Sequence, residues 1–154
     1  MASDRGINVR VQRGDFDVAH EQGLLTEGRT DVGAVVAFTG LCRGEGGRLA
    51  ALELEHYPGM AEAELTRIAT ACRERWPVSG MTIVHRFGRI EPGENIVLVV
   101  AASPHRQAAF EAAQFAMDFL KTDAPFWKKQ HMADGGEAGW VEARDADKDA
   151  ANRW

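Results

Sequence analysis

Cysteine is scarce in this sequence, and long apolar runs are missing. Its 154 residues include two cysteines, Cys42 and Cys72, and neither has a second cysteine or a histidine at the spacing of a zinc site. We therefore expect free thiols and no metal site. No apolar run approaches the roughly 20 residues of a membrane span, and the first residues lack the apolar core of a secretion signal. A cytoplasmic protein is the expectation.

Positive charge is also in short supply. Lysine and arginine number 18 against 23 acidic residues, which gives a net charge of −5. General binding to nucleic acid or to anionic membranes needs a broad basic surface, so both are excluded, while a local basic pocket is still compatible. The usual hydrolase, phosphate-loop and dinucleotide motifs are missing as well. The run Gly44–Gly47 lacks the strand, turn and helix with a lysine that a phosphate-binding loop requires.

The hydrophobic pattern predicts several strands in a single domain over residues 1–154. No repeat or linker divides the chain, and its length suffices for one buried core. Strands are expected at 7–12, 33–40, 51–56, 81–90, 95–102 and 140–143. The continuous apolar run at 33–40 favours a central strand covered on both faces. A Pro-Gly turn at 91–94 predicts that the two strands around it pair antiparallel.

Two main helices are predicted. Apolar residues recur at helical spacing from Ala61 to Trp76, and Cys72 lies on that face, so we expect it in the core. Ser103-Pro104 has the form of a helix start, and the helix is expected to run to about Lys121 with most of its sides buried. Shorter helices are expected after Asp15 or Asp17 and near the C-terminus. The fold class is therefore α+β, with a mixed or mainly antiparallel sheet.

Cations gather where anions could bind. Lys121, Lys128 and Lys129 fall within nine residues, separated by a proline and an aromatic pair. A helix C-terminus favours a cation, so a purely structural role for Lys121 is also open, as is a solvated basic turn. His105 and Arg106 follow the start of the same helix, where an arginine opposes the helix dipole unless an anion binds.

Other candidates have competing structural interpretations. Arg43 lies in a loop, where a lone arginine is usually solvated. A cation beside Cys42 could activate its thiol, but no histidine is adjacent to act as a base. His56 and His85 lie within predicted strands without ligand spacing, so structural histidines are the default. The residues alone therefore indicate an α+β domain with an anionic ligand near His105 and the lysines.

Six segments resemble, in order, the large, catalytic subunit of molybdopterin synthase, the MoaE family. They are Phe38–Gly40 followed by Arg43, Leu54–Met60, Val84–Gly88, Ser103–Arg106, Met117–Lys128 and Trp140–Arg144. The resemblance covers nearly everything from Gly33 to Trp154 and is weak only in the loops 44–50 and 131–139. The runs 121–128 and 56–60 are specific to the family.

The resemblance implies a fold, a reaction and a partner. The fold would be the α/β hammerhead of the family. The reaction converts cyclic pyranopterin monophosphate (precursor Z) to molybdopterin, in the biosynthesis of the molybdenum cofactor. Sulfur would come from the C-terminal thiocarboxylate of a small ubiquitin-like MoaD-type subunit. Two copies of this chain would form a homodimer within a heterotetramer. No cofactor is expected, because the substrate is itself a pterin cofactor precursor.

The resemblance also carries over individual residues. Lys121 and Lys128 match the two catalytic lysines, the first beside the carbonyl of the tail and the second in an orienting role. Residues expected to bind substrate are Arg43, His105, Arg106, Lys129, Gln130 and Arg144. His105 lies 16 residues before Lys121, roughly 24 Å along a helix at 1.5 Å per residue. His105 and Arg106 are therefore expected to serve the active site of the opposite subunit.

Two alternatives belong to other classes. A non-catalytic module could bind the tail of a ubiquitin-like protein without turnover. An acid–base enzyme could also act alone on a phosphorylated metabolite through His105 and Arg106. Dithiolene formation in the presence and absence of the small subunit separates the three hypotheses.

Overall fold

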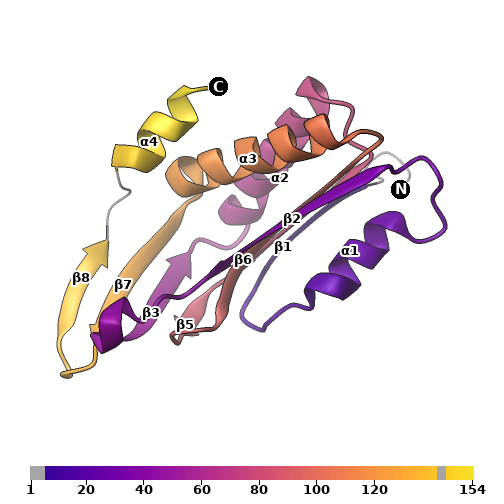
Figure 1. The fold of residues 1–154 in the computed structure, drawn as a ribbon. Helices are drawn as coiled ribbons and strands as arrows, with labels where there is room; N and C mark the ends of the chain where they lie inside the picture. The colour runs from indigo at the N-terminus through magenta and orange to yellow at the C-terminus, as the bar shows by residue number, and fades with distance from the viewer. Residues whose placement is uncertain (1–5, 142–144) are drawn as a thin grey trace.

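The computed structural model describes residues 6–141 and 145–154. In chain order its elements are β1 (Ile7–Gln12), α1 (Val18–Thr26), β2 (Ala34–Leu41), the 3₁₀ helix η2 (Glu45–Gly47), β3 (Leu49–His56), α2 (Met60–Arg75), β4 (Gly80–Arg86), β5 (Gly88–Ile90), β6 (Asn95–Ser103), α3 (Arg106–Asp123), β7 (Phe126–Met132), β8 (Glu137–Val141) and α4 (Asp145–Asn152). The helices and strands form a mixed α+β fold, as predicted (Figure 1).

The first sheet has four strands in the order β1-β4-β6-β2. β1 pairs parallel with β4, and the other two pairings are antiparallel. α2 and α3 cover one face of this sheet, and α1 lies against the other (Figure 1). Because side chains alternate along a strand, neighbouring residues of β4 enter different cores. Ile83 packs under α2 and α3, while Val84 packs with Leu25 of α1.

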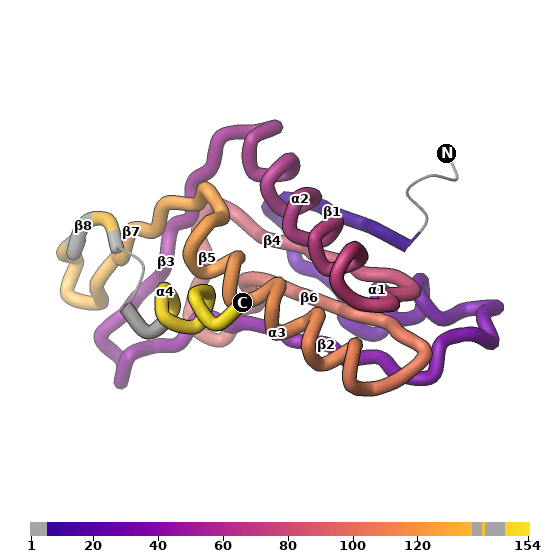
Figure 2. The backbone as a smooth tube through the Cα atoms, turned by 90° about the horizontal axis from the view of Figure 1, so that it is seen from above, coloured from indigo at the N-terminus to yellow at the C-terminus, as the bar shows by residue number. Residues whose placement is uncertain are grey.

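The second sheet is antiparallel and has the order β5-β3-β7-β8. α3 begins just after β6 of the first sheet and ends just before β7 of the second (Figure 2). The C-terminal turn of α3 therefore lies where the two sheets meet. The predicted mixed and mainly antiparallel pairing is confirmed, and the structure adds that the strands divide between two sheets.

Both main helices are confirmed, with one change at the start of α3. α2 covers Met60–Arg75, and Cys72 is fully buried on its inner face. α3 begins at Arg106 with His105 as its N-cap residue. Ser103 is the last residue of β6, and its hydroxyl accepts a hydrogen bond from the His105 N–H at 3.3 Å. The predicted capping hydroxyl therefore stabilises the turn before the helix and does not cap the helix itself.

The predicted strand at 33–40 is present, but the prediction that it is a central strand covered on both faces is wrong. β2 pairs with β6 alone and forms an edge of the first sheet, with Ala37 and Phe38 exposed. An apolar run indicates that its residues avoid water. It does not indicate whether a neighbouring strand or another surface covers them.

Two further boundaries differ from the predictions. The predicted strand at 81–90 is divided into β4 and β5, because Gly88 takes a positive φ of 88° and turns the chain toward the second sheet. The loop named at 131–139 is shorter than expected, since β7 continues to Met132 and its partner β8 begins at Glu137. Half-exposed strands accept polar residues on their solvent side, so polarity alone did not mark a loop.

None of the helices in the described ranges is both long and apolar enough to cross a membrane.

Candidate functional site

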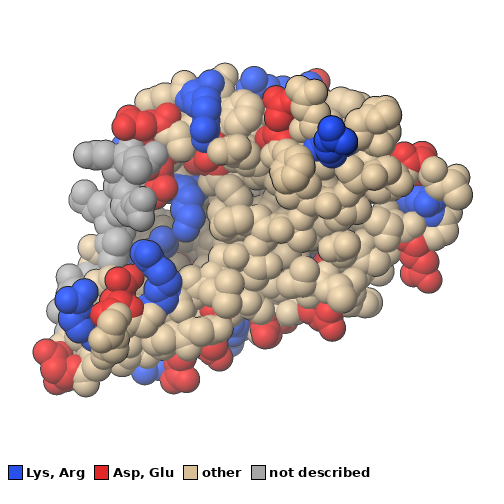
Figure 3. All heavy atoms as spheres, in the orientation of Figure 1, with Lys and Arg blue, Asp and Glu red and all other residues tan. Residues whose placement is uncertain are grey.

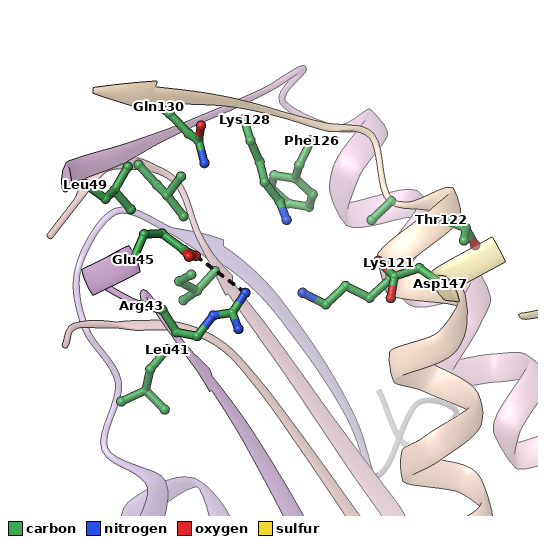
Figure 4. A pocket seen from close by; sticks show the side chains of 13 residues that line it. Leu41, Arg43, Glu45, Leu49, Lys121, Thr122, Phe126, Lys128, Gln130 and Asp147 are labelled. Atoms are coloured by element: carbon green, nitrogen blue, oxygen red, sulfur yellow. Dashed lines mark ion pairs between the residues drawn. The ribbon is translucent and has the colours of Figure 1, made fainter. Parts of the chain in front are cut away.

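A pocket of about 520 Å³ lies where the end of α3 meets the second sheet. We call it the outer pocket. Its lining residues are Leu41, Arg43, Glu45, Leu49, Leu52, Ile96, Lys121, Thr122, Ala124, Phe126, Lys128, Gln130 and Asp147. They come from segments that are far apart in the sequence, namely the end of β2, η2, β3, the start of β6, the end of α3, β7 and α4. The close view shows three cationic side chains directed into this space (Figure 4).

Arg43 enters the pocket from the segment that follows β2. Its guanidinium is 3.5 Å from the Glu45 carboxylate, and 77% of its side chain is exposed. An ion pair so open to water contributes little to stability. Arg43 is therefore available to an anionic ligand at a small energetic cost.

Lys121 and Lys128 face the same space from two different elements. Lys121 lies in the last turn of α3, where the helix dipole favours a cation. Ala124 and Pro125 separate that helix from β7, and the third residue of this strand is Lys128. The two-residue connection turns the chain from the helix into the strand, and both lysines line one pocket.

Alternation along β7 decides which neighbouring side chains join them. Phe126, Lys128 and Gln130 line the pocket, while Trp127 and Lys129 point to the opposite face. The Lys129 ammonium lies 5.4 Å from the ring centroid of Trp140, its partner across the strands. Of the two residues expected beside the pocket, the structure thus places Gln130 in its lining and Lys129 outside it.

Two other expected site residues lie far from this pocket. His105 and Arg106 are exposed at the opposite end of α3 and are not part of its lining. A single copy of the chain therefore does not bring them to Lys121. The remaining residue, Arg144, lies outside the described residues.

Sequence reasoning did not select His85 as a site residue. A second space of about 90 Å³, the inner pocket, is lined by Gly40, Leu41, His85, Ile96, Val97, Met117, Leu120, Lys121, Ala124, Phe126 and Lys128. Both catalytic lysine candidates therefore border His85. The spacing along β4 held no signal for this, because strands distant in the chain build the pocket.

Burial and the two lysines keep His85 neutral. Burial lowers the pKa of His85 to about 4, and the charges of Lys121 and Lys128 act in the same direction, against a hydrogen bond to Arg86 that raises it. The ring lies parallel to that of Phe126, with centroids 3.8 Å apart and planes 13° apart. His85 is thus a rigid, uncharged group beside two cations.

Neither cysteine has the environment of a nucleophile. Burial raises the pKa of the Cys42 thiol, and the carboxylates of Glu94 and Glu45 act in the same direction. Burial also raises the pKa of Cys72 to about 12. A thiol reacts as its thiolate, so both positions are unsuited to attack at neutral pH. Within residues 6–141 and 145–154, no group of three or more histidine, cysteine or acidic side chains could hold a metal ion.

The surface charge around the site is local. Lysine and arginine side chains border a hollow in the left half of the molecule and extend into it (Figure 3). One carboxylate, Asp147 of α4, also lines the outer pocket. A cationic pocket on a chain with a net charge of −5 suits one small anionic ligand and does not suit a polyanion.

Comparison with known proteins identifies the family of this arrangement. A family model described as MoaE protein matches residues 11–123. The molybdopterin synthase catalytic subunit of Mesorhizobium japonicum is 69% identical over 146 residues, which cover 95% of this chain and 92% of that protein.

Solved structures agree. The molybdopterin biosynthesis MoaE protein of Burkholderia ambifaria is 44% identical, with a TM-score of 0.82 over 96% of this chain and 97% of that one. Molybdopterin synthase of Staphylococcus aureus is 32% identical, with a TM-score of 0.77 over 85% of this chain and 94% of that one. The chain belongs to the MoaE family.

Proposed function

We propose that this chain is the catalytic subunit of a molybdopterin synthase. It would convert cyclic pyranopterin monophosphate to molybdopterin with sulfur delivered as a thiocarboxylate by a small ubiquitin-like subunit. The supporting observation is the convergence of Arg43, Lys121 and Lys128 on one pocket from three separate segments. Family membership and the names of its relatives add the reaction.

The pocket suits the charges of this reaction. The pterin phosphate and the thiocarboxylate are both anionic, so they repel each other in water. Clustered cations lower the cost of bringing them together. Arg43 offers a planar fork of donors that matches phosphate, while a lysine offers a mobile point charge.

The sulfur transfer needs no external oxidant or reductant. In each of two transfers, the carrier sulfur forms a bond to a side-chain carbon of the pterin and its bond to the carrier's acyl carbon breaks. In each transfer, water supplies the oxygen that leaves the carrier with a carboxylate. One transfer opens the cyclic phosphate, whose ester oxygen stays on the phosphate, and in the other the displaced substrate oxygen departs as water. Lys121 acts beside the acyl carbonyl, where an amine can move protons or attack. Lys128 orients the tail and stabilises the developing charge. No bound cofactor is part of the scheme.

The partner and the assembly are part of the proposal. The Mesorhizobium relative is described as a catalytic subunit, and a catalytic subunit implies at least one further subunit. We expect a small MoaD-type carrier on each of two copies of this chain, in a cytoplasmic heterotetramer. His105 and Arg106 lie a helix length from Lys121 and would complete the site of the opposite copy, with Arg144 as a further anion contact. Gln130 would contact the substrate within the pocket, and Lys129 would act from its rim.

The test is dithiolene formation from precursor Z and thiocarboxylated carrier. Lys121→Ala is expected to lower turnover by at least about a hundredfold, because it removes a group that acts in the transition state. Lys148→Ala is the matched control, since Lys148 is an exposed lysine of α4 that does not line the pocket. Its turnover should stay within about twofold of the wild type, as for most surface changes.

Two results would contradict the proposal in different ways. Full turnover by Lys121→Ala would remove Lys121 from the reaction. A wild-type protein that binds the carrier tightly but forms no dithiolene would instead be a binding module.

A further inference from the structure

His85 borders the inner pocket from the end of β4. It is 9% exposed, and its strand partner Val97 lines the same pocket. Phe126 stacks on its ring and lies two residues before Lys128 in β7. The imidazole therefore forms part of a wall shared with both lysines.

The hydrogen bond on one side of the ring identifies its tautomer. His85 Nδ1 is 2.8 Å from the carbonyl oxygen of Arg86. A carbonyl oxygen only accepts, so Nδ1 carries the hydrogen and donates it. In a neutral imidazole the lone pair is then on Nε2. Nε2 is thus the ring nitrogen available to a ligand, and it accepts.

The groups around His85 Nε2 in the inner pocket are hydrogen-bond donors and apolar side chains. Among the described residues that line the inner pocket, the other polar side chains are the ammonium groups of Lys121 and Lys128, which only donate. A ligand that fits must therefore bring negative charge for the lysines and a donor for His85. The volume of the inner pocket, about 90 Å³, favours a residue without a side chain.

We propose that His85 is a further binding residue of this site, whose Nε2 accepts a hydrogen bond from the last backbone N–H of a glycine-ended peptide tail. The inference rests on the proposed function, which supplies such a tail. The terminal carboxylate or thiocarboxylate of the tail meets the lysines. Its last N–H leaves water on entering the pocket and needs a partner there.

Three substitutions separate this role from a structural one. His85→Gln places an acceptor near the position of Nε2 and should keep carrier affinity close to that of the wild type. His85→Asn keeps a donor for Arg86, and His85→Phe keeps the stacking on Phe126, but neither keeps the acceptor. Each should weaken binding about tenfold, the effect of leaving one buried donor unpaired. Thermal unfolding of each variant confirms that it is folded.

The matched probes are two semisynthetic carriers ending in Gly-Gly, one with its last peptide amide and one with an ester in place of that amide. The ester removes the N–H, so the wild-type protein should bind it about tenfold more weakly. His85→Phe should bind both carriers alike.

Equal binding of the two carriers by the wild type would overturn the inference without any variant. If only His85→Phe keeps the affinity for the carrier, the role of His85 is stacking on Phe126. If only His85→Asn keeps it, the role of His85 is the hydrogen bond to Arg86. Turnover of precursor Z by the wild type tests the proposed function separately, so the two failures are distinguishable.

Discussion

Lys128 and Lys129 are neighbours in the chain, yet the first lines the pocket and the second lies over Trp140. Their difference comes from the pleat of β7, which sends successive side chains to opposite faces. Cys42 also shows that the environment matters more than the neighbour in sequence. Arg43 follows it, yet burial and nearby carboxylates raise the pKa of its thiol. At the residue scale, the environment decides which of several similar side chains can act.

His85 should make stability depend on pH. Its pKa is about 4 in the folded protein against 6.5 for an ordinary histidine. The unfolded chain therefore binds a proton that the native ring does not, and stability is lost as the pH falls from 6.5 to 4. The full difference is worth about 3 kcal/mol.

Chemical denaturation of wild type and His85→Phe between pH 7 and pH 4 measures this contribution. The variant has no imidazole to titrate there, whereas the carboxylates titrate in both proteins. We expect the wild type to lose about 3 kcal/mol more than the variant over this range. Parallel curves would show that His85 does not titrate differently on folding.

α3 is the element that connects the parts of the site. It spans the first sheet, carries Lys121 to the second sheet and exposes Arg106 at its other end. The C-terminal segment is fastened to it, because Asp118 accepts hydrogen bonds from Arg153 at 2.8 Å and from the indole of Trp154. Trp154 also contacts Trp76 and Phe115 edge to face, so the docking of α4 depends on this ring.

Trp154→Ala should loosen the C-terminal helix. The loss of a packed ring and its hydrogen bond is expected to lower the free energy of unfolding by about 2–3 kcal/mol. Amide hydrogen exchange should accelerate across Asp145–Asn152. Trp140, which is 51% exposed, provides the control, and its replacement by alanine should cost less than about 1 kcal/mol. Unchanged exchange in α4 would mean that the helix is held by other contacts.

The whole molecule leaves apolar surface at the edge of the first sheet. Phe38 of β2 is 41% exposed and Phe110 of α3 is 61% exposed. Exposed apolar residues of this size are common at surfaces that another chain covers. Together with the separation of Arg106 from Lys121, this exposure fits a dimer in which each copy completes the site of the other.

Mixed dimers test this arrangement. Lys121→Ala and Arg106→Ala should each be inactive alone, since every site lacks one residue. After unfolding and refolding in equal amounts, activity should return to about a quarter of wild type, because half of the dimers are mixed and each holds one complete site of two. Sites formed within one copy would give no such recovery, and sedimentation should show a dimer before and after mixing.

Local chemistry explains why much of the chain was predictable. The helical period of residues 61–76 and the capping aspartate before α1 identified their elements directly, because both are signals within a few residues. The resemblance also assigned Lys121 and Lys128 to one site, and the short turn at Pro125 agrees with that assignment. A two-residue connection leaves the chain few other paths.

The pairing between distant strands could not be predicted from such local signals. The edge position of β2, the division of residues 81–90 between two sheets and the place of His85 beside the lysines depend on contacts across long stretches of chain. A strand's pattern records which of its faces avoids water, but not which neighbour covers that face. The sequence by itself therefore determined the two main helices, most of the strands and the cationic residues. Only the tertiary structure decided that a neutral histidine shares their pocket, because long-range packing alone brings β4 against the end of α3 and β7.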